Sequence, residues 1–404
     1  MTSPTQKPAA SEAANGPDIV LARLLPLMPA MGITRLANLT GLDILGIPVA
    51  AAVRPNSRSL AVHQGKGLTL AAAKVSAVME AAEAHHAEFI DAPLRWGRRR
   101  DLPVPTVDPA RLPRMPGDGD PEEDRCLWIE GRDLMTDAPC WVPHELVHAD
   151  YTAPQPAGSG LFQATTNGLA AGATPQAAMA HGLCEAIERD AMALWYDAGA
   201  ALGAAARALD LASVRDRICA ELLRRIEATG AAIAAWDVTS DIGLPTFVCI
   251  IVAPDDDPHG VETELGAACH ADPATALLKA LLEAAQTRIT RISGARDDFG
   301  TESYDRPARE RWMSEGQAWL AAARGPRRTA MPAAAPAPAS ASHALDAILD
   351  RLRRSGFEQA IWVDLTKPGI GIPVGRAIVP GLEGPWTTDG DYAPGDRAHQ
   401  GAEP

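Results

Sequence analysis

The stretch ATTNGLAAGATPQAAMAHGLCEAIERDA, residues 164–191, contains the start of a predicted helix and a pair of acidic side chains on that helix. Thr174 followed by Pro175 marks the start, because threonine caps free backbone N–H groups and proline suits the first helical turn. The apolar spacing that follows predicts a helix to about Trp195. Glu185 and Glu188 are three residues apart, so they share one face of this helix.

Two further helices are predicted at residues 69–89 and 272–292, and both carry charged side chains at helical spacing. Carboxylates among apolar neighbours are costly to bury unless they bind a cation, and Mg²⁺ prefers carboxylate and phosphate oxygens. If the glutamates of the predicted helices converge, they would hold two Mg²⁺ ions against a triphosphate. The alternative is that each acidic pair faces water. The charged residues of these two helices are Glu80, Glu83, Lys279 and Glu283.

The run TTNGLAAG, residues 165–172, contains two glycines and lies just before the predicted 174–195 helix. Backbone N–H groups of such a run, together with the N-terminus of the helix, favour binding of an anion. A second run, Gly65-Lys66-Gly67, adds a cation close in sequence to the first acidic helix. Plain turns are the alternative for both runs, and the Walker A pattern G-x-x-x-x-G-K-[ST] occurs nowhere in the chain. The candidate phosphate contacts are Lys66, Thr165, Asn167, Gly172 and Thr174.

The composition narrows the class of protein. Lys and Arg number 37 against 51 Asp and Glu, and this net charge of −14 disfavours nucleic acid as a partner. No apolar run approaches the roughly 20 residues of a membrane span, and the N-terminal residues lack a signal-peptide core. The six cysteines are scattered without a CxxC pair, which indicates neither a disulfide framework nor a zinc ribbon. We therefore expect a cytoplasmic protein with reduced thiols.

Two catalytic patterns are better explained as accidents. His144-Glu145-Leu146-Val147-His148 matches the zinc-protease motif H-E-x-x-H, but the segment has too short an apolar pattern for the long helix that the motif needs. Cys184 and Cys269 each have a histidine nearby in sequence, yet free cysteines are more often small core residues than nucleophiles. Neither zinc proteolysis nor cysteine catalysis is the favoured interpretation.

Helices and strand-like runs alternate irregularly, which favours an α+β fold of mixed sheets packed with Ala-rich helices over a doubly wound sheet. A fourth helix, 212–229, is expected to end at Gly230. The predicted strands are 44–53, 126–129, 231–238, 246–253, 360–364 and 374–379.

Several long segments together resemble the YcaO family. Besides residues 164–191, they are GLDILGIPVAAAVRP (41–55), GKG (65–67), MEAAEAHHAE (79–88), LLKALLEAAQTRITRISGARDD (277–298) and LTKPGIGIPVGRAIVPGLEG (365–384). The resemblance covers roughly residues 30–384 and implies a YcaO-type ATP-binding fold. It also implies an ATP- and Mg²⁺-dependent enzyme in which a nucleophile attacks a peptide amide, the resulting oxyanion takes the γ-phosphoryl group, and phosphate then leaves.

The resemblance also implies roles for particular residues. Arg189 would contact the phosphates, and Lys279 and Glu283 stand where the family usually has Arg-x-x-x-Glu facing the nucleotide. Ala173 and Ala177 stand where many members have Asn and Glu, so part of the phosphate cradle departs from the family pattern. The Mg²⁺ ligands implied by position are Glu80, Glu83, Glu185 and Glu188. No residue of the chain is singled out as a nucleophile or base.

The branch of the family is suggested by what the chain lacks. It ends in HQGAEP rather than a Pro-rich tail, and its Pro-Ala-Pro run, residues 336–338, is internal. Members that work with a TfuA-type partner look similar, which favours thioamide formation over an azoline-forming cyclodehydratase. A degenerate scaffold or binding subunit is the non-enzyme alternative. Expected partners are a peptide or protein substrate and a TfuA-like or peptide-recognition protein. A second copy of the chain, forming a homodimer, is a further possible partner.

Three regions are expected along the chain. Residues 1–18 are expected to be disordered, 19–384 to form the YcaO domain, and 385–404 to form a flexible tail. Within the domain, residues 101–123 are expected to form a Pro-rich loop and residues 321–342 a low-complexity insertion.

Overall fold

The computed structural model describes residues 16–103, 105–117, 119–197, 207–254, 263–300, 304–325, 328–334, 338–384 and 393–400. The described strands form three sheets in which every pairing of named strands is antiparallel, and the helices pack on these sheets. The expected α+β class is therefore confirmed. Within the same residues, none of the helices combines the length and the apolar character that crossing a membrane requires.

The first sheet is N-terminal and lies against helix α3 (Leu70–Glu88). Gly65 on its third strand lets the helix approach closely, because an added Cβ would lie 2.0 Å from the backbone nitrogen of Ala77. Ala73, Ala77 and Ala81 are fully buried, so the alanine content of α3 serves this close packing. Helix α2 (Pro17–Leu24) also packs on α3. The strand order is β1 (Arg35–Asn38), β2 (Val49–Val53), β3 (Val62–Lys66).

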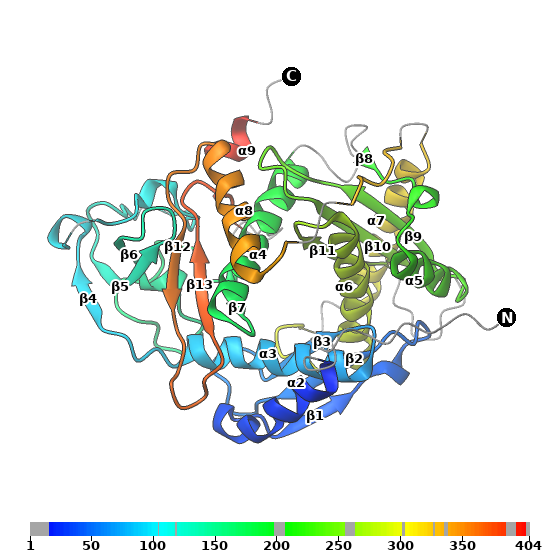
Figure 1. The fold of residues 1–404 in the computed structure, drawn as a ribbon, viewed down its shortest axis with the longest axis horizontal. Helices are drawn as coiled ribbons and strands as arrows, with labels where there is room; N and C mark the ends of the chain where they lie inside the picture. Colours follow the sequence, from blue (N-terminus) through cyan, green and yellow to red (C-terminus); the bar gives the residue numbers. More distant parts are fainter. Residues whose placement is uncertain are drawn as a thin grey trace.

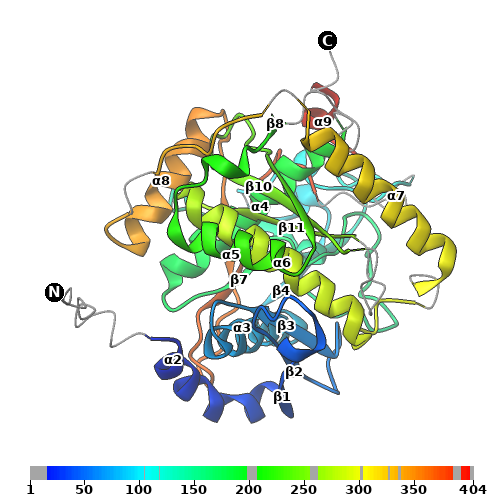
Figure 2. The same ribbon diagram turned by 90° about the vertical axis from the view of Figure 1, so that its right-hand side faces the viewer.

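The second sheet has helices on both faces. Phe247, Cys249 and Ile251 face α5 (Arg217–Glu227) and α6 (Pro273–Ser293), whereas the alternate residues face α7 (Arg306–Ala323) and part of α4. This explains why the central strand is an unbroken apolar run. Figure 2 shows the N-terminal sheet beneath α6. The strand order is β11 (Thr263–Cys269), β10 (Thr246–Val252), β9 (Ala232–Asp237), β8 (Arg207–Ala208).

The third sheet joins strands that are far apart in the sequence. Strand β13 (Val374–Ile378) pairs with β7 (Leu169–Ala171), about half the chain away. Helix α4 (Pro175–Asp197) packs on this sheet beside α8 (Ala341–Arg354) and also reaches the second sheet, so it links two cores. The strand order is β4 (Leu94–Gly97), β5 (Cys126–Asp133), β12 (Ile361–Asp364), β13, β7, and β6 (Pro139–Pro143) pairs with β5.

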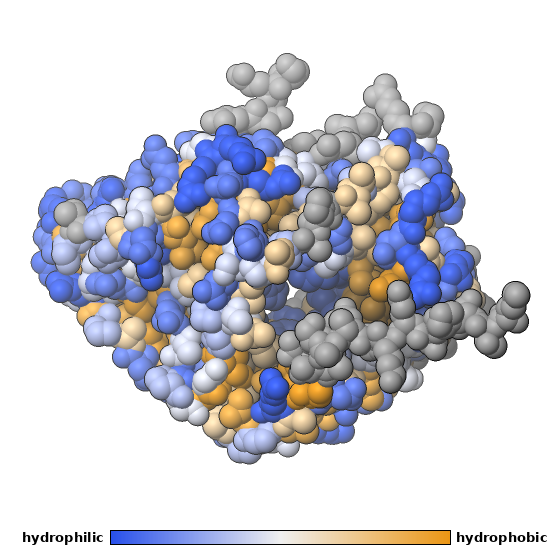
Figure 3. All heavy atoms as spheres, in the orientation of Figure 1, coloured by the Kyte–Doolittle hydropathy of each residue, from blue (hydrophilic) through white to orange (hydrophobic). Residues whose placement is uncertain are grey.

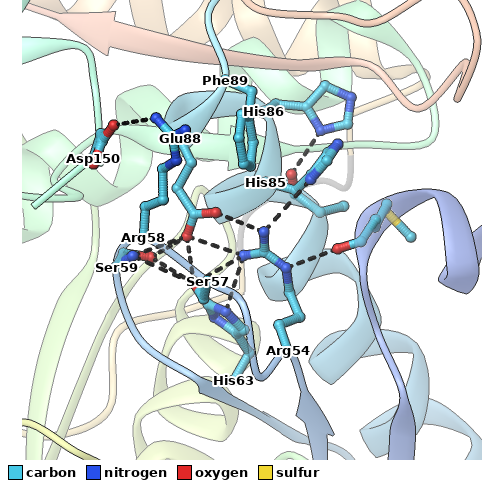
Figure 4. Close-up of polar contacts among 12 residues, drawn as sticks. Arg54, Ser57, Arg58, Ser59, His63, His85, His86, Glu88, Phe89 and Asp150 are labelled. Atoms are coloured by element: carbon cyan, nitrogen blue, oxygen red, sulfur yellow. Dashed lines mark hydrogen bonds and ion pairs between the residues drawn. The ribbon is translucent and has the colours of Figure 1, made fainter. Parts of the chain in front are cut away.

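A buried polar network ties the C-terminal end of α3 to the β2–β3 connection (Figure 4). Arg54 Nη2 lies 2.6 Å from Glu88 Oε2, and the hydroxyls of Ser57 and Ser59 donate to the other carboxylate oxygen at 2.5 and 2.6 Å. Burial would raise the pKa of Glu88, but these hydrogen bonds lower it below its ordinary value. Burial also lowers the pKa of His63, which contacts Arg54, to about 3. The network fixes the orientation of α3.

The structure confirms the three main predicted helices as α3, α4 and α6. The helix expected from residue 212 begins at Arg217 instead, because Asp216 caps its backbone N–H groups and a separate 3₁₀ turn, Leu211–Ser213, precedes it. The strand expected from residue 44 begins at Val49. Helices α2, α7 and α8 and the strands β1, β3, β4, β6, β7, β8 and β11 were not predicted as elements.

The segments expected to lack order are partly structured. Helix α2 begins at Pro17, inside the segment 1–18, whereas residues 1–15 lie outside the described part. In the 321–342 insertion, Thr329 bridges to Leu209, and residues 326–327 and 335–337, which include part of the Pro-Ala-Pro run, are not described. Residues 101–123 contain two 3₁₀ turns and two undescribed positions, 104 and 118.

Residues 393–400 of the expected flexible tail belong to the described part of the chain. They form a β-bridge at Ala393 and helix α9 (Asp396–Gln400). The cause is Arg397, which pairs with the fully buried Asp190 of α4 at 2.9 Å and with Asp241 at 2.7 Å. Residues 385–392 and 401–404 of the expected tail lie outside the described part.

Candidate active site

Three helices border the centre of the molecule in Figure 1: α3, α4 and α6. Figure 3 shows a hollow at this place, with hydrophilic surface in its depth. The three helices bring together the charged residues that the sequence analysis placed on separate segments, and β3 adds one cation from its last position. These residues are Glu80 and Glu83 on α3, Glu185, Glu188 and Arg189 on α4, Lys279 and Glu283 on α6, and Lys66 on β3.

Backbone N–H groups from neighbouring strands orient two of the carboxylates. Ala171, the last residue of β7, donates to Glu83 Oε1 at 2.7 Å. Cys269, the last residue of β11, donates to Glu188 Oε2 at 3.2 Å. Each of these carboxylates is therefore held at one oxygen by a neutral backbone donor at the end of a strand.

Two cations lie directly against the acidic residues. Lys66 Nζ donates to Glu283 Oε2 at 2.5 Å, which joins the N-terminal sheet to α6 across the hollow. Arg189 lies 3.5 Å from Glu188 and 4.0 Å from Glu185, one helical turn away on α4. Lys66 and Arg189 hold the pKa of Glu283 below its ordinary value although burial alone would raise it.

The remaining carboxylates are only partly neutralised. Burial raises the pKa of Glu80 to about 7, opposed by Lys66 and Arg296 and reinforced by Glu283. Burial likewise raises the pKa of Glu185 to about 7, with Arg189 opposing and Glu188 adding repulsion. Burial also raises the pKa of Glu83 and of Glu188. The site thus has more negative charge than its own cations offset, and binding a further cation would relieve it.

The donor set fits Mg²⁺, because the available ligands are carboxylate oxygens and no soft sulfur ligand is needed. Within the described part of the chain, no three His, Cys, Asp or Glu side chains are close enough to hold a metal ion by themselves. Mg²⁺ commonly takes one or two carboxylates and completes its octahedron with phosphate oxygens and water. The glutamate pairs therefore fit Mg²⁺ that arrives with a nucleotide rather than a preformed metal cage.

The predicted phosphate contacts of the 165–174 segment do not form one cradle. Strand β7 intervenes, and its three residues separate Asn167 from Gly172 by about 10 Å. Thr174 caps α4 by accepting from Ala177, and it lies about 16 Å along the helix from Glu185. Thr165 and Asn167 line a small pocket together with Ala186 of α4. Contacts of Gly172 and Thr174 with the nucleotide remain predictions.

Two arginines near the site were missed from the sequence. Arg296 lies close enough to Glu80 to lower the pKa of that carboxyl, although it follows the end of α6 at Gly294. Arg376 on β13 lies near Glu185 and is buried at 2% exposure. Both belong to quoted motifs, 277–298 and 365–384, but only the folded chain brings them beside the glutamates.

The H-E-x-x-H segment is confirmed as an accidental match. His144–Leu146 forms a single 3₁₀ turn rather than a long helix. Glu145 accepts hydrogen bonds from the backbone N–H groups of Gly160, Leu161 and Phe162, so it holds a loop in place. This is a structural role and leaves no catalytic carboxylate for a zinc-bound water.

All six cysteines are buried and unbridged in the structure, and this includes Cys184 and Cys269. Burial raises the pKa of Cys269 well above its ordinary value, which favours the unreactive thiol. The hydrogen bond with Cys269 lowers the pKa of Cys184, which precedes Glu185 on α4. Both fit the interpretation of small core residues better than that of nucleophiles.

Comparisons with known sequences agree with this geometry. A family model described as YcaO cyclodehydratase, ATP- and Mg²⁺-binding, matches residues 64–383. A protein in the tfuA 3′ region of Rhizobium leguminosarum bv. trifolii is 36% identical over 382 residues, which cover 91% of this chain and 87% of that protein. A protein of Methanothermobacter thermautotrophicus is 34% identical over 366 residues, covering 87% of this chain and 90% of that protein.

Solved structures share the fold. The structure of YcaO from Methanopyrus kandleri bound with AMPPCP and Mg²⁺ matches with a TM-score of 0.66 at 24% identity, covering 91% of each chain. A heterocyclase in complex with substrate and cofactor matches with a TM-score of 0.73 at 20% identity. That match covers 92% of this chain and 53% of the heterocyclase, so this chain spans about half of the heterocyclase's length.

Proposed function

This chain belongs to the YcaO family, and on that premise we propose that it uses Mg²⁺ and ATP to activate a backbone amide of a ribosomally made peptide or protein. The observation that carries the proposal is the hollow where α3, α4 and α6 meet. Four incompletely neutralised glutamates and several cations face one another there. Phosphoryl transfer needs this kind of site, since it depends mainly on positioning and charge neutralisation.

The residues divide by charge. Glu80 and Glu83 from α3 and Glu185 and Glu188 from α4 would hold Mg²⁺, which when bound neutralises the triphosphate. Arg189 and Lys279 would contact phosphate oxygens directly. Glu283 would keep Lys66 aimed into the hollow through their 2.5 Å hydrogen bond. Thr165, Asn167, Gly172 and Thr174 complete the proposed set of polar contacts.

For the chemical outcome we favour thioamide formation. A sulfide-equivalent donor adds to the amide carbon, and the carbonyl electron pair moves to oxygen. The oxyanion attacks the γ-phosphorus, and ADP leaves with the electrons of the broken bond. The sulfur then loses its proton, and phosphate leaves with the electron pair of the carbon–oxygen bond. The product is the thioamide. Amide, hydrogen sulfide and ATP are thus converted to thioamide, ADP and phosphate.

The relative in the tfuA 3′ region supports this branch and also supports a TfuA-like partner. Azoline formation is the second candidate, favoured by the fold shared with a heterocyclase. A degenerate scaffold is the third, motivated by Ala173, Ala177 and Lys279. The presence of all four glutamates around the hollow argues against the interpretation as a degenerate, non-catalytic scaffold. Use of ATP and six unbridged cysteines fit a cytoplasmic location.

Titration calorimetry with Mg·ATP tests the proposal. We expect wild type to bind, and we expect the double variant Glu185→Gln/Glu188→Gln to lose at least about tenfold in affinity, since two charge-bearing ligands are removed. The matched control, Glu122→Gln/Glu123→Gln, removes two exposed carboxylates of a surface turn and should leave binding unchanged. No binding by wild type at millimolar nucleotide would leave only the scaffold interpretation.

Mass spectrometry of a candidate peptide after incubation with a sulfide donor and Mg·ATP separates the two chemistries. Thioamide formation exchanges one oxygen for sulfur and raises the mass, whereas azoline formation removes one water and lowers it. A mass loss without added sulfide would replace thioamidation with cyclodehydration as the assigned reaction.

A further inference from the structure

Arg376 on β13 is a buried cation with incomplete pairing. Its side chain is 2% exposed, and its Nη2 atom donates to the backbone oxygen of Thr165 at 2.6 Å. Within the described residues, its Nε and Nη1 atoms have no hydrogen-bond partner, and no carboxylate lies within ion-pair distance. Nearly every buried polar group in a folded protein is satisfied, so this exception calls for an explanation.

Other buried arginines of this chain show the usual arrangement. Arg288 has no exposed side-chain surface and pairs with Asp43 at 2.9 Å, and Arg54 pairs with Glu88 at 2.6 Å. Burial lowers the pKa of Arg376 to about 10, so it still carries its charge at neutral pH. An uncompensated buried charge is destabilising, and such groups persist where function needs them.

Arg376 and Asn167 both line a small pocket. It has a volume of about 40 Å³, and its polar lining includes Thr165, Asn167 and Arg376. The side-chain oxygen of Asn167 is also buried without a hydrogen-bond partner. These unpaired atoms are themselves shielded from solvent, so a ligand in the pocket reaches them when the two side chains turn toward it.

The position of the pocket links it to the proposed reaction site. Ala186, which follows the Mg²⁺-facing Glu185 on α4, lines the pocket. Glu185 is near enough to favour the charged form of Arg376. A second cavity, of about 250 Å³, shares Pro113, Leu382 and Glu383 with the first and is also lined by the loops at residues 110–113 and 355–357.

We propose that Arg376 and Asn167 form a binding subsite for the backbone amide that is modified. The guanidinium donates to the amide oxygen, and the Asn167 oxygen accepts from the amide N–H. A simple anion would match the guanidinium but not the Asn167 oxygen, whereas an amide matches both. The uncompensated charge of Arg376 then stabilises the oxygen as it becomes an oxyanion. This inference rests on the proposed amide activation, and it assigns Asn167 to the peptide rather than to the nucleotide.

The first test compares thermal stability. Arg376→Met should leave Tm unchanged or raise it by about 2 °C, because it removes an unpaired buried charge while keeping the volume. Arg288→Met, equally buried but paired, should lower Tm because it leaves Asp43 alone. A fall in Tm for Arg376→Met as large as that for Arg288→Met would assign Arg376 a structural role and overturn the proposal.

The second test measures binding of N-methylformamide, a mimic of one peptide unit, by ligand-observed NMR. We expect a signal with wild type that is lost in Arg376→Met and in Asn167→Leu, and that is retained in the exposed control Arg132→Met. No signal with wild type, or an unchanged signal in Arg376→Met, would overturn the proposal. Complete displacement of the probe by formate or phosphate would show an anion site and would overturn the amide assignment.

Titration of the same proteins with Mg·AMPPNP keeps the two proposals separate. Arg376→Met should bind the nucleotide within about twofold of wild type, because the subsite faces the peptide. A larger loss would place Arg376 in the nucleotide site and overturn the inference. Absence of nucleotide binding in wild type would instead refute the proposed function, and the stability and probe results would still decide whether Arg376 binds an amide.

Discussion

Glu80 and Glu185 have pKa values of about 7 although they come from different helices. In both cases the first cause is burial, and neighbouring carboxylates add repulsion. Sequence spacing identified these residues, but their separation of about a hundred positions hid the fact that they share one hollow. Their protonation is therefore a property of the folded site, and it predicts a pH dependence for metal binding.

Mg·nucleotide affinity is expected to fall as the pH falls below 7. A carboxyl group with a raised pKa of about 7 is largely protonated below that pH, and Mg²⁺ must displace the proton to bind. Each proton displaced lowers the affinity by up to about tenfold per pH unit. Calorimetry from pH 8 to 6 in buffers of different ionisation enthalpy measures both affinity and proton release. A Glu80→Gln/Glu185→Gln variant should show a shallower slope, because Glu83 and Glu188 with their raised pKa values remain, and a pH-independent affinity in wild type would contradict the assignment.

At the residue scale, the charged groups on helices were predictable and their partners were not. Helical spacing indicated Glu83 and Glu188, but the donors that orient them are backbone N–H groups at the ends of β7 and β11. Backbone donors carry no sequence signal, because every residue except proline has one. Arg376 was missed for a related reason, since only the pairing of β13 with β7 places it beside Thr165.

At the scale of elements, helices α3, α4 and α6 were predictable because each has a capping residue at its N-terminus and a long apolar pattern. Strands β7 and β8 have only three and two residues, too few to show an alternation of apolar and polar positions. The close packing between elements depends on single glycines. Gly65 between β3 and α3 is the clearest case, because it borders Lys66 on one side and the glutamate-bearing helix on the other.

Gly65→Ala is expected to separate β3 from α3 and to damage the site. The new Cβ would meet backbone atoms of α3 at 2.0 and 2.3 Å, which a side-chain rotation cannot relieve. We expect a loss of about 3 kcal/mol in the free energy of unfolding, at the upper end for overpacking. Mg·nucleotide affinity should also fall, because Lys66 and Glu80 move apart.

Gly41→Ala is the matched control, since nothing lies within 4 Å of its added Cβ and its backbone is not in the left-handed region. Denaturant unfolding and calorimetry on both variants check the prediction. Equal behaviour of the two variants would show that the α3–β3 contact adjusts without consequence for the site.

At the scale of the whole molecule, α4 connects the third sheet, the second sheet and the C-terminal segment. The link to the C-terminus is Asp190, which follows Arg189 and is fully buried. Arg397 donates to both oxygens of Asp190, and the backbone N–H of Glu383 donates to one of them. A segment expected to be flexible therefore holds the helix that carries half of the proposed Mg²⁺ ligands.

Arg397→Ala is expected to destabilise the protein by about 3 kcal/mol, because it leaves the buried Asp190 carboxylate without its cation. The disturbance should also weaken Mg·nucleotide binding, since Asp190 adjoins Arg189 on α4. Denaturant unfolding and calorimetry measure the two effects. Arg353→Ala, which removes an exposed helix pair with Asp350, should change neither. Unchanged unfolding of Arg397→Ala would show that the C-terminal segment does not hold α4.

The resemblance of several segments to known proteins identified the family, and the sequence by itself determined the α+β class, the three long helices and the glutamates with their cations. These features depend on local spacing, capping and composition, which are written in neighbouring residues. Only the tertiary structure decided that the 165–174 segment divides around β7, that residues 393–400 are anchored, and that Arg376 lies unpaired beside the hollow. These facts depend on contacts between residues as much as two hundred positions apart. Such contacts follow from the packing of a whole core, and no local pattern encodes them.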